Sequence, residues 1–176
     1  MVGRNDDEHQ HEVQITRHYY LGITEVTQWQ EVMGTTPWKG RERVPEAADI
    51  AASYISWNDA VKFCEQLSQQ ERRAYRLPTE AEWEHACRAG TTTPYRFGSD
   101  ESQLGEYAWY SVNAENVDQY YAHQVARKSP NNFGLYDMHG NVYEICQDRL
   151  GDYPQSRVTD SSGPSRRGDV PCLVET

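Results

Sequence analysis

The fold expected for this chain is decided by one stretch, NNFGLYDMHGNVYEICQD, which spans residues 131–148. Its first half has the composition of a turn, and its second half predicts a strand over residues 142–147. Within it, Asp137 and Glu144 carry hard oxygen ligands seven positions apart, with Gly140 between them. A chain that wraps a cation needs such a flexible residue, and oxygen donors favour calcium over zinc. The spacing therefore indicates a calcium loop, with a solvated turn as the alternative.

A second group of acids and amides precedes this stretch. Its members are Asn113, Glu115, Asn116 and Asp118. They lie within residues 91–132, where no long periodic element is present. Irregular segments of that length are uncommon in compact domains unless they are functional or tied down, which favours a bound metal. We interpret the group either as a second cage of oxygen ligands or as a solvated polar loop.

Two helices are predicted by their capping residues. Ser56 and Asp59 resemble a capping box that opens one helix, and Thr79 and Glu82 form another after Pro78. The buried stripe of the first helix is expected to be Ala60, Phe63, Cys64 and Leu67. Gly90 stands where a glycine commonly ends a helix, so the second helix is expected to stop there.

The two ends of the chain carry weaker patterns. Alternation over residues 12–26 predicts two strands joined by a tight turn near Arg17 and His18. Residues 27–34 have helical spacing and end at Gly34. The tail from Asp148 is polar and rich in turn residues, and it predicts no definite element.

Length and charge limit the class of protein. A chain of 176 residues fits one domain, and its five Trp and twelve Tyr offset an apolar fraction of 37%. The formal charge of −10 disfavours nucleic acids and anionic membranes as partners. No stretch reaches the length of a membrane span, and the polar start lacks a signal-peptide core. We therefore expect a cytoplasmic protein, with secretion left open if the start lies upstream.

Motifs for covalent catalysis are missing from the sequence. The chain has four cysteines: Cys64, Cys87, Cys146 and Cys172. The cysteines form no CxxC pair. The histidines do not have the spacing that is typical of zinc sites, and the sequence contains no motif of a serine nucleophile. Cys64 and Cys87 are interpreted as small buried apolar residues. The acidic run over residues 76–84 around Arg76 fits either an ion-pair hub or a substrate groove.

Two segments resemble the signatures of a known family. RLPTEAEWEHACRAG (residues 76–90) and the stretch at 131–148 are similar to the two signature segments of the formylglycine-generating-enzyme, or sulfatase-modifying factor, family. Supporting matches in the family's order are YYLGITEVTQWQEVMG (19–34), YISWNDAVKFCEQL (54–67) and YAWYSVN (107–113). The resemblance covers residues 11–164 of a single domain over 1–176, with a divergent tail at 165–176.

The resemblance implies an α+β fold of the C-type-lectin-like superclass, with little regular secondary structure and calcium ions that tie its loops. The family's calcium motif maps onto the side chains of Asp137 and Glu144 and the carbonyls of Gly140 and Val142. A second calcium site maps onto the side chains of Asn113 and Asp118 and the carbonyls of Ala114 and Tyr120.

The resemblance also implies a chemistry. Enzymes of the family oxidise a sulfatase cysteine to formylglycine with molecular oxygen and, in aerobic members, copper held by two cysteines of the C-terminal segment. The tail here departs from that segment, and Cys172 is single in it, so no catalytic residue is assigned and copper is expected only in a catalytic form. Whether the chain is an enzyme is left open.

Three interpretations of the function follow. They are a non-catalytic binding or scaffold module with a peptide or protein partner, a truncated fragment, and an active oxidase. The sequence favours the first two. Loss of the C-terminal strands would leave a sheet edge exposed, which makes self-association plausible.

Overall fold

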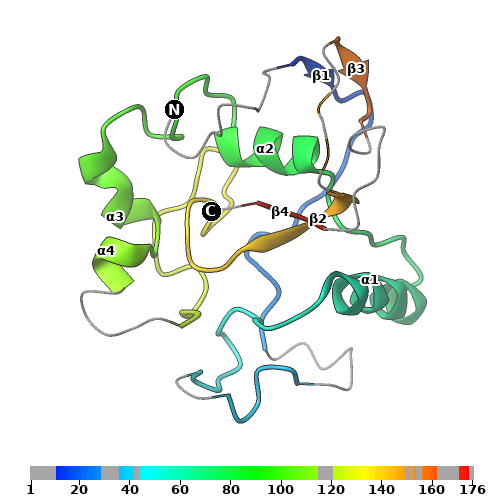
Figure 1. The fold of residues 1–176 in the computed structure, drawn as a ribbon, viewed down its shortest axis with the longest axis vertical. Helices are drawn as coiled ribbons and strands as arrows, with labels where there is room; N and C mark the ends of the chain where they lie inside the picture. The colour runs from blue at the N-terminus through cyan, green and yellow to red at the C-terminus, as the bar shows by residue number, and fades with distance from the viewer. Residues whose placement is uncertain are drawn as a thin grey trace.

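The computed structural model describes residues 11–28, 36–41, 44–114, 121–149, 151, 153, 156–161 and 171–174. In chain order its elements are β1 (Val13–Gln14), α1 (Trp57–Glu71), α2 (Glu80–Arg88), η2 (Glu101–Gln103), α3 (Leu104–Tyr107), α4 (Ser111–Ala114), β2 (Glu144–Arg149), β3 (Val158–Thr159) and β4 (Pro171–Val174). The fold is therefore α+β with little regular secondary structure, as expected (Figure 1). Among the described helices, none combines the length and apolarity needed to cross a bilayer.

Both predicted helices form, and each begins at the predicted capping box. Ser56 Oγ accepts from Asp59 N, and Thr79 Oγ1 accepts from Glu82 N, with the reciprocal bonds also made. α2 ends in the left-handed conformation at Ala89, one residue before Gly90. In the predicted stripe of α1, Ala60 is buried and the other three residues keep part of their surface exposed. α1 therefore lies at the edge of the core.

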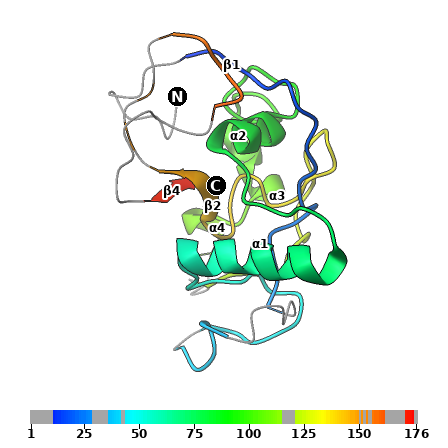
Figure 2. The ribbon, with the colours of Figure 1, turned by 90° about the vertical axis from the view of Figure 1, so that its right-hand side faces the viewer.

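β2 joins the two helices to the rest of the molecule. The indole Nε1–H of Trp57 donates to Cys146 O (3.0 Å), and Gln147 N–H donates to Pro78 O (2.8 Å). Glu80 N–H donates to Asp148 Oδ2 (2.6 Å) at the start of α2. Figures 1 and 2 accordingly both place β2 between α2 and α1.

The C-terminal tail contributes two strands that the sequence did not predict. β4 pairs antiparallel with β2, and β3 pairs in parallel with β1. The sequence led us to expect an exposed sheet edge. This expectation is wrong for one edge of β2, because β4 pairs with it there. The final strand was predicted over 142–147, and β2 begins and ends two residues later.

The hairpin predicted over residues 12–26 is wrong. After β1, the chain bends toward Asp160, whose Oδ1 and Oδ2 accept from Thr16 N (2.7 Å) and Thr16 Oγ1 (2.6 Å). Residues 17–26 form no strand, and Tyr19 in this segment contacts α2 through its hydrogen bond to Glu82 O. Of the helix predicted over 27–34, Thr27 instead makes a β-bridge to Ala51, and residues 29–34 lie outside the described residues.

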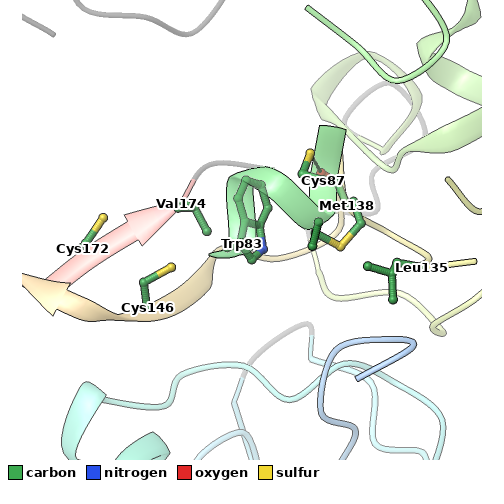
Figure 3. Packing of buried hydrophobic residues seen from close by; sticks show 8 residues of the cluster. Trp83, Cys87, Leu135, Met138, Cys146, Cys172 and Val174 are labelled. Atoms are coloured by element: carbon green, nitrogen blue, oxygen red, sulfur yellow. Dashed lines mark hydrogen bonds between the residues drawn. The ribbon is translucent and has the colours of Figure 1, made fainter. Parts of the chain in front are cut away.

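The main apolar cluster lies under α2 and against the β2–β4 pair (Figure 3). Its members are Trp83, Ala86, Cys87, Leu135, Met138, Cys146, Cys172 and Val174. The loop at 135–138 thus shares one core with α2, β2 and β4, which fixes the start of the predicted calcium loop.

Candidate functional site

A tight turn lies at the centre of the predicted calcium loop. Asp137 and Asn141 have φ values of 59° and 89°, in the left-handed region. A Cβ atom on Gly140 would overlap Trp109 O and lie 2.9 Å from Ala108 Cβ. The turn is held there because Asn141 N–H donates to Trp109 O (2.8 Å). Glycine is thus required by the close approach of another backbone.

Asp137 is almost fully buried in this turn, with 1% of its surface exposed. Its Oδ2 accepts from Ala126 N (2.7 Å), but no described group donates a hydrogen bond to its Oδ1. A buried carboxylate oxygen without a partner costs about 1–3 kcal/mol or more. The site therefore requires a proton or a cation at this oxygen.

Glu25 brings a second carboxylate to Asp137, which the sequence did not predict. Its Oε1 accepts from Asn141 Nδ2 (3.0 Å), whereas its buried Oε2 receives no hydrogen bond from the described residues. Burial, and then the charge of Asp137, raise the pKa of Glu25 to about 9. Burial also raises the pKa of Asp137, and this shift is partly offset by the hydrogen bond from Ala126 N–H and by the nearby Glu25 carboxyl. These two groups can share one proton, or a divalent cation can neutralise them both.

Glu144 lies within electrostatic reach of the same pair at the start of β2. Burial raises its pKa to about 6, and the charge of Asp137 adds to the shift. The described residues contain no group of three His, Cys, Asp or Glu side chains arranged to hold a metal. A calcium site made from two carboxylates and backbone carbonyls does not need a third such group. The two buried carboxylates, whose charge Lys128 offsets in part, are hard oxygen donors of the kind that calcium prefers.

The second predicted site is only partly described. Asn113 lies in α4, where its Oδ1 accepts from Tyr110 N (2.8 Å) and its Nδ2 donates to Ala108 O (2.8 Å). These bonds give the side chain a structural role in the turn. Ala114 ends α4, whereas Asp118 and Tyr120 lie outside the described residues. The second calcium site stays a prediction.

The acidic run over residues 76–84, which enters α2, forms an ion-pair hub. Arg76 Nη1 and Nη2 donate to Glu82 Oε2 (2.7 Å) and Oε1 (2.6 Å), and Thr79 N–H donates to Glu82 Oε2 (2.9 Å). Tyr19 O–H donates to Glu82 O (3.0 Å). Of the two interpretations of this run, the geometry supports the hub.

A surface groove that the sequence did not predict lies beside this hub. It has a volume of about 410 Å³, and its lining includes Tyr19, Tyr20, Leu21, His85 and Phe133. Tyr20 is fully exposed and Phe133 is half-exposed. The hairpin prediction missed the groove, because it paired the part of the lining at residues 15–21 within a hairpin and not with α2 and the loop at 133–135.

The four cysteines all lie among the described residues, and none lines this groove. Burial raises the pKa of the Cys64 and Cys146 thiols. Burial also raises the pKa of the Cys87 thiol, to about 12. Cys87 also donates to Met138 O (3.2 Å). The sequence suggested that Cys172 stands alone in the tail. In the structure it lies in the apolar core together with Cys146.

Known proteins are similar to this chain in sequence and in fold. The family described as "Sulfatase-modifying factor enzyme 1-like domain" matches residues 1–170. A chaperone protein LppX from Paenibacillus barcinonensis is 30% identical, with 73% of this chain and 61% of that protein covered. A formylglycine-generating enzyme from Thermomonospora curvata is 32% identical, with 81% and 50% covered.

Among solved structures, the Treponema denticola variable protein 1 superposes with a TM-score of 0.72 at 29% identity, covering 83% of this chain and 68% of that one. The chain spans less than two thirds of the length of the curated relatives named above. Because the family match extends over nearly the whole chain, this protein belongs to the sulfatase-modifying factor family.

Proposed function

We propose that this chain is a calcium-stabilised binding module of the sulfatase-modifying factor family that holds a peptide segment of a partner protein. The observation that carries the proposal is the pair of buried carboxylate oxygens, Asp137 Oδ1 and Glu25 Oε2, to which no described group donates. A binding module needs a rigid surface, and this chain has few regular elements to provide one.

Calcium would be held by the side chains of Asp137 and Glu144 and by the carbonyls of Gly140 and Val142, with Glu25 adding negative charge. Bound calcium supplies the positive charge that the buried carboxylates lack and ties the loop to β2. Asn141 connects this loop to Glu25, 116 residues away in the sequence. The metal would therefore stabilise the contact between this loop and the N-terminal segment, whose residues 15–21 line the groove.

The groove is our candidate surface for the peptide. Exposed aromatic side chains and a few polar groups in a concave site are typical of ligand recognition. Tyr20 and Phe133 supply the aromatic surface, and His85 and Arg17 supply polar groups. The name of the Paenibacillus relative describes a chaperone, and a chaperone acts on polypeptides, which supports a peptide partner.

Peptide binding can be tested by selection from a phage-displayed peptide library, followed by fluorescence polarisation with a selected peptide. We expect Tyr20→Ala and Phe133→Ala each to weaken binding by about tenfold, because each removes buried aromatic area at an interface. Tyr54→Ala is the matched control, since Tyr54 is also exposed but does not line the groove. A selection without binders, or an equal loss for Tyr54→Ala, would count against the groove.

A second candidate is formylglycine generation, which is favoured by the similarity to the Thermomonospora enzyme. It requires thiolates that a substrate can reach. Three of the cysteines are buried, and Cys64 is only half-buried but has a raised pKa, so we prefer the binding module. Incubation with a sulfatase-motif peptide, copper and oxygen distinguishes the two, because only the oxidase produces an aldehyde on the peptide.

A further inference from the structure

The β2–β4 pair brings two thiols together. Glu144 lies opposite Val174 and Ile145 lies opposite Leu173, and Cys146 and Cys172 are the next residues along the two strands. The register shifts between Ile145 and Arg149, so the two cysteines lie where this irregular interval begins, next to the paired Ile145 and Leu173. Directly opposed residues in antiparallel strands have Cα atoms about 4.5–5.5 Å apart, and residues that adjoin such a pair on both strands lie close to the range that a disulfide spans.

The two side chains also share one face of the strand pair. Both project from the ribbon to the same side, toward α2, as Figure 3 shows. Cys146 is fully buried and Cys172 has 7% of its surface exposed. The charge of Cys172 is among the causes that raise the pKa of Cys146, after burial, so the two sulfurs lie within electrostatic reach.

The other two cysteines are placed differently. Cys87 lies on α2 with Trp83 between it and the pair in Figure 3, and its thiol donates to Met138 O. Cys64 lies on α1 and does not belong to the main apolar cluster. The structure thus selects one pair among the four cysteines, all of which are thiols.

We propose that Cys146 and Cys172 are a cross-strand dithiol that a small-molecule disulfide oxidises to an intramolecular disulfide, fastening β4 to β2. In the first step Cys172, the more exposed thiol, attacks the reagent, whose S–S bond breaks. A mixed disulfide forms on Cys172, and one reduced thiol leaves with the proton that Cys172 loses. In the second step Cys146 attacks the Cys172 sulfur and releases the second reduced thiol with its own proton.

The disulfide would stabilise the position of the last described strand. β4 places Cys172 and Val174 in the core, but it pairs with β2 over only a few residues. A cross-link limits the freedom of the unfolded chain, and for a loop of this length the melting temperature should rise by roughly 5–10 °C. Because both thiols are buried and Cys146 is hard to ionise, the reaction should be slow and should require β4 to open.

The test incubates the whole chain with oxidised or reduced glutathione, alkylates the remaining thiols in denaturant, and maps peptides without reduction. We expect one cross-linked peptide pair containing Cys146 and Cys172, a mass loss of two hydrogens, and the higher melting temperature. A map dominated by glutathione adducts, by links to Cys87 or Cys64, or by unmodified thiols would overturn the proposal.

Two variants make the test specific. Cys64→Ser should retain both the cross-link and the rise in melting temperature, whereas Cys172→Ser should lose both. The peptide map of the unaltered chain decides the question even if Cys172→Ser fails to fold. A melting temperature that rises equally in oxidised Cys172→Ser would contradict a role for this pair.

Discussion

At the scale of single residues, the turn proposed to bind calcium depends on positions that tolerate little change. Asp137 and Asn141 have positive φ values, and Gly140 lies against the Trp109 carbonyl. The sequence correctly placed Asp137 and Gly140 in a turn that leads into a strand, and Glu144 begins that strand. From the sequence, Gly140 was explained only by the flexibility that a tight turn needs. The close contact with the Trp109 carbonyl could not be inferred from local spacing.

Gly140→Ala should destabilise the protein by about 2–3 kcal/mol, because the new Cβ overlaps Trp109 O and the turn must shift. Gly105→Ala is the matched control. Gly105 lies in α3, and a Cβ added to it would lie 3.9 Å from its nearest neighbour, so alanine should stabilise by about 0.5 kcal/mol. Urea unfolding of both variants measures this difference, and equal effects would refute the contact.

Glu144→Gln tests the second acid of the loop. It keeps the shape of the side chain but removes the charge that would bind calcium. We expect the variant to melt close to the unaltered protein in chelator and to gain much less stability when calcium is added. Scanning fluorimetry over a calcium titration measures this, and a full response in the variant would show that Glu144 is not a ligand.

At the scale of elements, α1 and α2 were predictable because their signals are local. Each capping box joins residues three positions apart, so it can be recognised in the sequence. The β1–β3 pair depends instead on contacts such as Thr16 with Asp160, 144 residues apart. The hairpin prediction failed because the alternation at 12–26 does not specify which segment the strand will pair with.

Glu82→Gln should destabilise α2 by about 1–3 kcal/mol at neutral pH, since it weakens both the Arg76 ion pair and the capping box. Bonding to Arg76 lowers the pKa of Glu82, so this stabilisation is present above the unfolded carboxyl pKa of about 4.3. It is lost as pH falls through the lower folded value. Urea unfolding at pH 7 and below pH 4 should show the difference between variants shrinking in acid.

Glu84→Gln is the matched control for this prediction. Glu84 pairs with Arg88 on the surface of the same helix, and 57% of its side chain is exposed. A surface pair of this kind contributes about 0–0.5 kcal/mol. If Glu84→Gln cost as much as Glu82→Gln, the stabilisation would come from overall helix charge and not from the hub.

At the scale of the whole molecule, contacts between distant segments hold together a chain with little regular structure. Glu25 and Asn141 join the N-terminal segment to the loop, and β2 joins both helices to β4. The α+β class and the family could be predicted from sequence. The groove, Glu25 and the Cys146–Cys172 pair could not, because each combines residues whose separation in the chain leaves no periodic or spacing signal.

The calcium proposal is tested most directly by the melting temperature of the unaltered protein in excess calcium, in excess magnesium and in chelator. A ligand of the folded state at about 100 times its Kd stabilises by about 2.7 kcal/mol, so we expect calcium to raise the melting temperature by about 5–10 °C over chelator. Magnesium, which demands a smaller octahedral site, should do much less. Identical melting curves in calcium and in chelator would contradict the account.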